Sequence, residues 1–344
     1  MNYIGSKFSL IEFLKSSIAK ILEANGEERS PADMVFADLM SGTGVVCSAF
    51  KQDGYLVIAN DIQYYSYVIT KHIVENDDSL DEKRCLQLIE ELNNLEGVEG
   101  FIYKNYCFEG TEGQEFRRMY FTEYNAKKCD AIRIAIEEKR DKNLITDNEY
   151  FFLLGSLINS MDKYANTASV YGAYLKKLKK SALKEMKLEP LPVISGLHNG
   201  KVYNEDISEL IKHVSGDILY LDPPYNARQY CTNYHLLETI ARYDNPDIHG
   251  KTGLREYAEQ KSDFCIKSKV EKAFAEIIKN ANFKYIFLSY NNEGLMSSQT
   301  IEKIMKKYGK YKCEMQEHRR FKADNARDAK ADKTFECLHC LIKK

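Results

Sequence analysis

The chain predicts an α/β protein built on a doubly wound parallel sheet. Residues 34–39 form a short apolar run that leads into a turn with two glycines, and residues 45–51 then have helical spacing. A second apolar run, residues 55–59, is followed by Asp61. Strand, glycine turn, helix, strand and acid in this order open such a sheet. We therefore expect a ligand at the carboxyl ends of these strands.

The strand pattern stops and later resumes, which predicts an insertion. Residues 97–200 are rich in aromatic and charged side chains and favour helices over residues 125–140 and 149–164. We expect residues 1–96 and 201–344 to form one domain, with 97–200 inserted into it. Further strands are predicted at residues 217–221, 285–289, 310–317 and 334–342.

Composition favours a cytoplasmic globular protein. Of the 344 residues, 44% are hydrophobic and 29% are charged, and no apolar run approaches the roughly 20 residues that span a bilayer. The formal net charge of −2 does not indicate a nucleic-acid-binding protein by itself. Basic clusters at residues 176–187 and 306–322 are local exceptions, and either one is equally well explained as a solvated helix face.

The nine cysteines are scattered, which favours reduced thiols over a disulfide framework. Cys337-Leu338-His339-Cys340 has the spacing of half a zinc site. However, it falls in the predicted strand 334–342, and strand residues three apart point to opposite faces. Since no second CxxC pair completes four ligands, we expect no metal on this motif.

The strongest chemical signal is Asp222-Pro223-Pro224-Tyr225, directly after the predicted strand 217–221. A carboxylate and a backbone carbonyl can both accept hydrogen bonds from an amino group on an aromatic ring. These two hydrogen bonds orient the amino group so that the lone pair of its nitrogen points at the carbon that it attacks. Proline stiffens the loop and so presets this geometry. Tyr225 offers a flat face for stacking a base. The alternative is a double-proline turn without a catalytic role.

A second signal combines the glycine turn with the acid after the next strand. In Asp38-Leu39-Met40-Ser41-Gly42-Thr43-Gly44, the glycines let the chain pass close beneath a ligand, and the following helix points its N–H groups toward it. Asp61 is placed to bind the two ribose hydroxyls of an adenosyl group. A solvated acid at a strand end is the alternative for Asp61.

Taken in order, these motifs resemble the DNA adenine methyltransferase family, and more narrowly its alpha group. The resemblance spans nearly the whole chain: Tyr3-Ile4-Gly5-Ser6-Lys7, the Asp38 to Gly44 loop, Asp61, a long insertion, and Asp222 to Tyr225. It implies a class I S-adenosylmethionine-dependent methyltransferase fold, with a seven-stranded sheet whose last hairpin is antiparallel. It also implies that residues 97–200 recognise the DNA target and that a flipped adenine is methylated at N6.

The resemblance assigns roles to individual residues. Asp222, Pro223, Pro224 and Tyr225 are implied to be catalytic, and Asp222 also to border the cofactor. Met40 stands where the family usually has phenylalanine, but methionine is apolar and adaptable enough to pack against the cofactor, so we expect binding to survive. The implied cofactor-binding residues are Tyr3, Ile4, Gly5, Ser6 and Lys7 at the methionine end; Asp38, Met40, Ser41, Gly42, Thr43 and Gly44 at the amino-acid part; Asp61 and Ile62 at the ribose; and Asp206 and Ile207 at the adenine. Asp206 is equally well explained as a helix N-cap.

The implied partner is double-stranded DNA. The implied cofactor is S-adenosyl-L-methionine, which is converted to S-adenosyl-L-homocysteine in the reaction, and no metal is implied. A monomer paired functionally with a cognate restriction endonuclease is typical of the family. For the candidate DNA contacts a plain surface role is as well supported: Tyr171, Tyr174, Lys176, Lys177, Arg228, Tyr230, Arg319, Arg320 and Lys322.

Three alternatives remain open. The same fold methylates RNA adenine, cytosine amino groups or protein glutamine in related enzymes. A relative that binds DNA without catalysis is a second possibility, although the intact Asp222 motif opposes it. A nicotinamide-dependent oxidoreductase would use the glycine turn but leaves Asp222-Pro223-Pro224-Tyr225 without a purpose.

Overall fold

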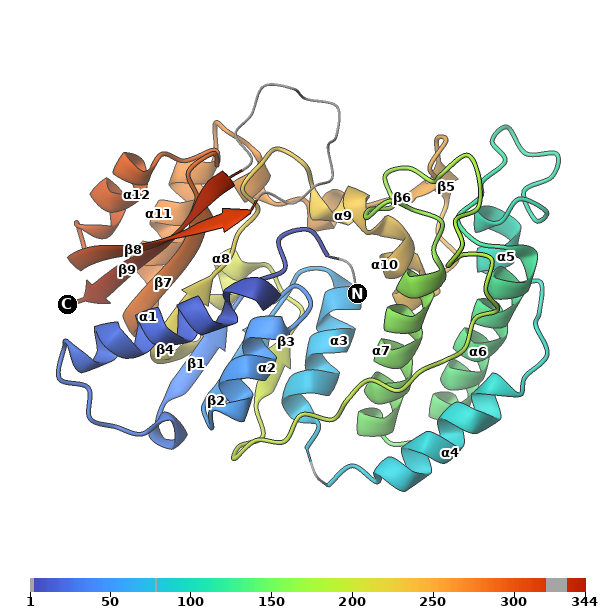
Figure 1. The fold of residues 1–344 in the computed structure, drawn as a ribbon, viewed down its shortest axis with the longest axis horizontal. Coiled ribbons are helices and arrows are strands. Elements are labelled where there is room, and N and C mark those ends of the chain that lie inside the picture. Colours follow the sequence, from blue (N-terminus) through green and yellow to red (C-terminus); the bar gives the residue numbers. More distant parts are fainter. Residues whose placement is uncertain (1–2, 78, 320–332) are drawn as a thin grey trace. The chain divides into compact units, whose positions relative to one another are not determined.

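The computed structural model describes residues 3–77, 79–319 and 333–344 (Figure 1). The chain forms two compact units, each assembled from separate segments. We call the first the helical unit; it comprises Met1–Ile4, Gln63–Val193 and Tyr230–Glu259. We call the second the sheet unit; it comprises Gly5–Ile62, Ile194–Gln229 and Gln260–Lys344.

The sheet unit is built on a seven-stranded sheet with the order β3-β2-β1-β4-β7-β9-β8. The first five strands in this order are parallel, whereas β9 runs antiparallel to both β7 and β8. This confirms the predicted α/β fold and its closing antiparallel hairpin. The strands are β1 (Val35–Asp38), β2 (Leu56–Asn60), β3 (Lys201–Tyr203), β4 (Ser215–Leu221), β7 (Asn282–Asn291), β8 (Gly309–Arg319) and β9 (Lys333–Lys343).

Helices cover both faces of this sheet, as its two-sided burial requires. On one face Phe36 of β1 stacks on Phe50 of α2 at 3.9 Å between ring centroids. On the other, Leu219 and Ile286 pack in one apolar cluster with α11 and α12. The helices of this unit are η1 (Phe8–Leu10), α1 (Ile11–Glu23), η2 (Pro31–Asp33), α2 (Val45–Gln52), α8 (Ile207–Leu210), η4 (Asp263–Cys265), α11 (Val270–Asn280) and α12 (Ser298–Met305).

The helical unit is arranged around α7 (Asp147–Tyr164), most of whose side chains are buried. The helix begins where it does because Thr146 and Glu149 form a reciprocal capping box that satisfies two backbone N–H groups. The predicted helices 125–140 and 149–164 are confirmed as α6 and α7. The other elements are α3 (Tyr64–Glu75), α4 (Glu82–Asn93), α5 (Phe101–Tyr106), α6 (Glu123–Asp141), α9 (Tyr230–Asn233), α10 (His235–Arg242), β5 (Ile248–His249) and β6 (Leu254–Arg255), with η3 (Ala258–Gln260) at its end in the chain.

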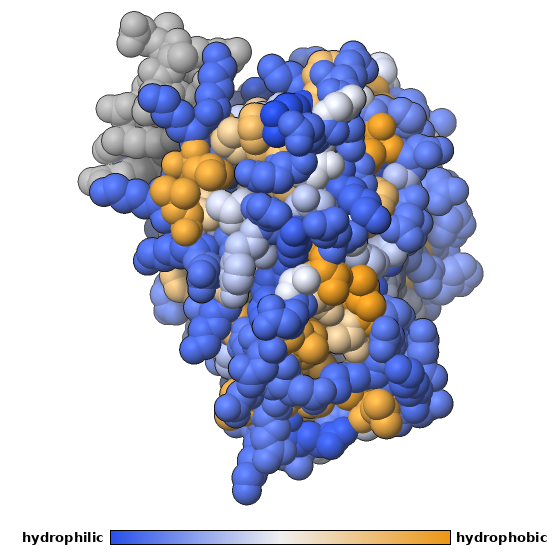
Figure 2. Space-filling view, turned by 90° about the vertical axis from the view of Figure 1, so that its right-hand side faces the viewer, coloured by the Kyte–Doolittle hydropathy of each residue, from blue (hydrophilic) through white to orange (hydrophobic). Residues whose placement is uncertain are grey.

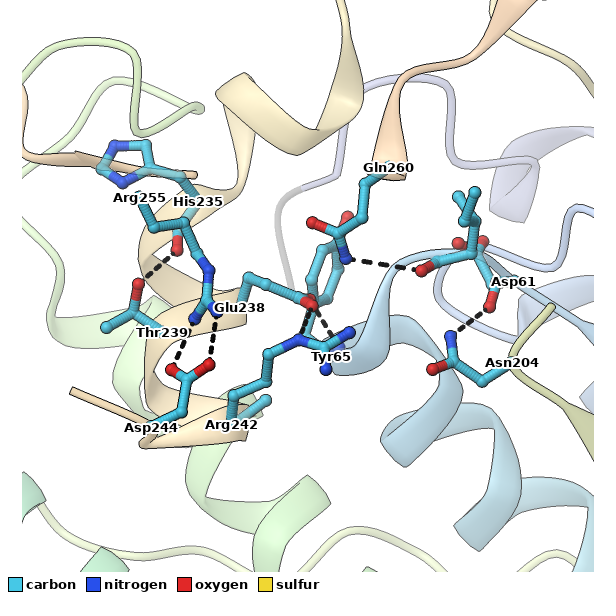
Figure 3. A network of polar contacts seen from close by, with 12 residues as sticks. Asp61, Tyr65, Asn204, His235, Glu238, Thr239, Arg242, Asp244, Arg255 and Gln260 are labelled. Carbon is cyan, nitrogen blue, oxygen red and sulfur yellow. Dashed lines mark hydrogen bonds and ion pairs between the residues drawn. The ribbon is translucent and has the colours of Figure 1, made fainter. Parts of the chain in front are cut away.

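Several polar side chains of the helical unit form hydrogen bonds and ion pairs with one another (Figure 3). Glu238 accepts hydrogen bonds from the backbone N–H of Tyr65 at 3.0 Å and from Arg242 at 2.5 Å. Arg255 makes a two-pronged ion pair with Asp244, at 3.0 and 2.6 Å. Because a buried charge without a partner is costly, these pairs fix how α10 packs on its neighbours.

The surface that Figure 2 draws is largely polar. Figure 2 shows mostly hydrophilic residues there, with hydrophobic ones in small separate patches. Scattered apolar side chains of this kind are ordinary for a protein surface. Among the residues that the structure describes, no helix combines the length and the apolar character that crossing a membrane requires.

Candidate active site

Three carboxylates stand at the carboxyl ends of neighbouring parallel strands in the sheet unit. Asp38 ends β1, Asp61 follows β2, and Asp222 follows β4. Since β1 pairs with both β2 and β4, these strand ends lie side by side. Ligands of open α/β sheets bind at this edge. The sequence prediction of a site here is therefore consistent with the strand order.

Asp222 belongs to a compact ionic cluster with Lys7, Tyr225 and Glu336. The Lys7 Nζ lies 2.9 Å from Asp222 Oδ1 and 3.3 Å from Glu336 Oε1. The Tyr225 hydroxyl lies 2.9 Å from the same Asp222 oxygen and 2.6 Å from the same Glu336 oxygen. One ammonium and one hydroxyl thus bridge two carboxylates, and the Lys7 side chain is only 6% exposed.

The electrostatics of the cluster follow from burial and the excess of carboxylates. Burial raises the pKa of Asp222; the Lys7 ammonium opposes this rise, and the charge of Glu336 adds to it. Burial alone would lower the pKa of Lys7, but Asp222 and Glu336 outweigh it, so the pKa of Lys7 is raised. Lys7 is therefore a permanent cation at neutral pH, and Asp222 is a more basic carboxylate than usual.

The geometry leaves one oxygen of Asp222 available. Both Lys7 and Tyr225 bind Oδ1, and among the described residues none forms a hydrogen bond to Oδ2. Asp222 is also the more accessible partner, with its side chain 18% exposed. The cluster therefore holds the carboxylate by one oxygen while the other can accept a hydrogen bond from outside.

Tyr225 is fixed on several sides. Its ring packs against Tyr290 with the centroids 4.8 Å apart, and the Lys7 ammonium lies 4.9 Å from its centroid. Its backbone carbonyl accepts a hydrogen bond from the N–H of Leu295 at 3.0 Å. These contacts make Asp222-Pro223-Pro224-Tyr225 an anchored loop.

The glycine turn after β1 is tied to the acid after β2. The backbone N–H of Gly42 donates to Asp61 Oδ2 at 2.9 Å. Gly42 and Gly44 have φ angles of 53° and 71°, a backbone conformation that residues with a Cβ rarely adopt. Asp38 is 1% exposed and accepts a hydrogen bond from the N–H of Met40 at 3.3 Å. Burial, followed by the charge of Asp222, raises the pKa of Asp38 to about 7.

A third segment, around Asn204 and Asp206, completes this edge. The amide of Asn204 donates to the backbone carbonyl of Asp61 at 2.7 Å (Figure 3). Asn60 bonds the backbone of Glu205 in both directions, at 3.0 and 3.1 Å. Asp206 caps α8 by accepting from the N–H of Ser208 at 2.7 Å, so the N-cap interpretation of this residue is confirmed. Its carboxylate still stands at the same end of the sheet.

The chemistry of these groups fits S-adenosylmethionine. Buried Asp38 would suit a cationic ammonium group, because a cation nearby favours the ionised carboxylate. Asp61, which directly follows β2, carries a carboxylate, the kind of group that accepts hydrogen bonds from hydroxyls. In the turn after Asp38, Gly42 and Gly44 have no side chains, so the backbone at these two positions can approach a ligand closely.

The remaining predicted residues are distributed over both units. Tyr3 and Ile4 belong to the helical unit, where Tyr3 stacks on Tyr234 at 4.6 Å and the N–H of Ile4 donates to the Tyr234 hydroxyl at 2.8 Å. Tyr230, in the same unit, donates to the carbonyl of Ile4 at 3.1 Å. Gly5, Ser6 and Lys7 belong to the sheet unit.

The candidate DNA-contact residues differ in exposure. Tyr171 is fully buried and donates to Asp162 at 2.9 Å, which places it in the core of the helical unit rather than on a DNA-facing surface. Tyr174 is half-buried, and its hydroxyl donates to the carbonyl of Arg117. The exposed candidates are Lys176, Lys177 and Arg228. Arg320, Lys322 and the side chain of Arg319 lie outside the described residues.

Glu336 is the site residue that sequence reasoning missed. It lies on β9, which pairs with β7 so that Glu336 stands opposite Asn291. The strand alternation of residues 334–342 was visible, and an acid within such a run was a usable signal. What the sequence did not show is that this face of β9 meets Lys7, 329 positions earlier in the chain (336 minus 7).

A family model and several named proteins match the sequence of this chain. A family model described as "D12 class N6 adenine-specific DNA methyltransferase" matches residues 3–337. The chain is 49% identical over 345 residues to Type II methyltransferase M.NlaIII of Neisseria lactamica, covering 100% of this chain and 99% of that protein. It is 41% identical to Type II methyltransferase M.FokI of Planomicrobium okeanokoites, covering 96% of this chain and 51% of that protein. It is 36% identical to Type II methyltransferase M.CviAII of Paramecium bursaria Chlorella virus 1, covering 94% and 93%.

Proposed function

We propose, from the premise that this chain belongs to the D12 class N6 adenine-specific DNA methyltransferase family, that Asp222 is its catalytic carboxylate and that Lys7 and Tyr225 hold it in place. The observation that carries the proposal is that both partners contact Asp222 Oδ1 and leave Oδ2 open. A preset acceptor of this kind costs no reorganisation when the substrate arrives.

The target is the exocyclic amino group of an adenine extruded from double-stranded DNA. Asp222 Oδ2 and the backbone carbonyl of Pro223 would accept hydrogen bonds from its two N–H groups. Pro224 stiffens the loop, and the face of Tyr225 offers a stacking surface for the base. Asp222, whose pKa is raised by burial, is also suited to take up the proton that the amino group loses.

S-adenosylmethionine supplies a methyl group on a sulfonium, an activated leaving group that needs no metal for transfer. We assign Asp38 to its ammonium group and Asp61 and Ile62 to its ribose. Met40, Ser41, Gly42, Thr43 and Gly44 form the turn beneath it. Asp206 and Ile207 are assigned to its adenine, and the segment Tyr3 to Lys7 to its methionine end. The product would be S-adenosyl-L-homocysteine.

We assign target recognition to residues 97–200, which lie mostly in the helical unit. Exposed Lys176, Lys177 and Arg228 are suited to phosphate contacts. Relatives named as Type II methyltransferases support a DNA-modification enzyme. We further propose that it acts as a monomer alongside a restriction endonuclease. Nucleoside analysis after reaction with plasmid DNA separates this function from methylation of RNA or protein.

Cofactor affinity should depend on pH through Asp38. The pKa of this carboxyl is about 7 in the free protein because of burial. A bound ammonium favours the ionised form, so binding releases a proton, and affinity should rise by up to about tenfold per pH unit below the pKa. Above the pKa it should level off. Calorimetric titration with S-adenosylmethionine across this range measures the slope.

The variant Asp38→Asn should bind the cofactor more weakly and with a flat pH profile. Asp33→Asn, a surface residue on η2, serves as the matched control and should keep the wild-type slope. An unchanged slope in Asp38→Asn would remove Asp38 from the ammonium site.

Glu336→Gln should shift the acid limb of the pH profile without abolishing activity. The charge of Glu336 contributes to the raised pKa of Asp222. Removing this charge lowers that pKa, so Asp222 stays ionised, and the enzyme stays active, to lower pH. The pH dependence of kcat/KM reports the change. Glu314→Gln on β8, an acid paired with Lys20 instead, should leave the profile unchanged. A wild-type acid limb in Glu336→Gln would show that the two carboxylates are not coupled.

A further inference from the structure

A group of potential metal ligands lies on the β8–β9 hairpin, outside the Asp222 cluster. The ligand atoms of Cys313, Cys337 and His339 all lie within 4.8 Å of one another. Cys313 of β8 stands directly opposite His339 of β9, and Cys337 precedes His339 by two positions. Residues two apart on a strand share one face, so register and alternation bring the three side chains together.

The surroundings of the group suit a bound cation. Cys337 and His339 are 4% and 1% exposed, whereas Cys313 is accessible to solvent. The Tyr311 hydroxyl lies 2.8 Å from His339 Nδ1, and its ring stacks on the imidazole with the centroids 6.0 Å apart. A hydrogen bond on one ring nitrogen fixes the orientation of the imidazole and leaves the other as a ligand, the usual arrangement at metal-binding histidines.

The ligand types indicate which ion fits. Two thiolates and one imidazole are borderline-soft donors, which zinc prefers over calcium or magnesium. The thiolate is the form that coordinates metals.

We propose that Cys313, Cys337 and His339 bind one zinc ion, with His339 Nε2 as the imidazole ligand and water in the fourth position on the accessible side of Cys313. Binding forms two zinc–sulfur bonds and one zinc–nitrogen bond. Any proton still on the two thiols leaves to solvent, and no oxidation or reduction takes place.

The proposed ligands are not the pair of cysteines in Cys337-Leu338-His339-Cys340, the motif that has the spacing of half a zinc site. Cys340 lies on the opposite face of β9, directly across from Lys312, and is therefore directed away from the other thiols. His339 replaces it, and Cys313 comes from the neighbouring strand. The site thus cross-links the edge strand β8 to β9.

A zinc ion at this position would also stabilise the strand that carries Glu336 of the proposed catalytic cluster. Glu336 immediately precedes Cys337 and faces the other side of the sheet, where it contacts Lys7. A zinc ion on Cys337 would hold this part of β9 in register with β8. We therefore assign it a structural role rather than one in methyl transfer.

The test measures metal binding by the full chain. The protein is stripped with a chelator, reloaded with Zn²⁺ and dialysed, and its zinc content is determined. Co²⁺ loading in parallel reports thiolate ligation by its charge-transfer absorption. We expect one zinc per chain in the wild type, and Tyr311→Phe should bind about 10–100-fold more weakly. Cys313→Ser and His339→Asn should lose more affinity than Tyr311→Phe.

Cys340→Ser is the matched control, since it alters the same motif on the opposite face and should keep the zinc. Circular dichroism tests whether each variant is folded. Of these variants, Cys313→Ser should disturb the fold least, because the Cys313 side chain is accessible to solvent. Zinc that protects Cys313 from a thiol reagent in the wild type supports the site independently. Failure of the folded wild type to retain zinc, or equal loss in Cys340→Ser, would overturn the proposal.

Discussion

Asp222→Ala is expected to lower the rate of methyl transfer by about 10²–10⁴-fold, the usual contribution of a positioned catalytic group. The substitution removes the acceptor for the amino group of the substrate. Lys7 keeps Glu336 as an ionic partner at 3.3 Å, so its charge does not become isolated and the fold should survive. Single-turnover transfer of labelled methyl to DNA measures the rate.

Two further variants separate the contributions of Asp222. Asp222→Asn keeps an acceptor oxygen but loses the charge, and its rate should lie between those of the wild type and Asp222→Ala. Asp263→Ala removes an exposed carboxylate paired with Lys269 and should leave the rate unchanged. Both Asp222 variants should still bind S-adenosylmethionine. Full activity in Asp222→Ala would remove this residue from the reaction.

Lys7→Met should have the second-largest effect. It keeps the length of the side chain but leaves Asp222 and Glu336 with no cation between them. Because the Lys7 charge opposes the rise in the pKa of Asp222, its loss should raise that pKa further. Activity should fall at neutral pH and recover in part as the pH rises. A pH profile of kcat/KM records both changes.

A double variant distinguishes charge balance from general damage. In the wild type, Glu336→Gln removes an acid that Lys7 neutralises. In the Lys7→Met background the same change removes an unneutralised acid, so it should restore activity at neutral pH. Such a coupling is what residues in direct contact show in a double-mutant cycle. An additive loss in the double variant would contradict the ionic account of the cluster.

Most of the sheet could be predicted from the sequence because most of its strands are apolar runs, several of which are followed by an acidic residue. The apolar run before Asp222 forms β4, and the apolar run that ends in Asp38, just before the glycine turn, forms β1. By contrast, β3 spans only Lys201–Tyr203, and β5 and β6 have two residues each. Elements this short carry no periodicity, so spacing alone could not reveal them.

The parts of the site that escaped prediction depend on register between distant segments. The motif around Lys7 was recognised, but its ion pair with Asp222 joins residues that only the fold brings together. Glu336 and the group of Cys313 and His339 depend on which residues of β8, β9 and β7 face each other. Strand alternation gives the face of a residue but not its partner across the ladder.

The most direct test of the central claim is methyl transfer from labelled S-adenosylmethionine to unmethylated plasmid DNA, with the product digested to nucleosides and separated. The account predicts that the label appears in N6-methyl-2′-deoxyadenosine with the wild type, and that it falls to near background with Asp222→Ala despite retained cofactor binding. Label in a cytosine derivative, or none in DNA while the cofactor still binds, would contradict it.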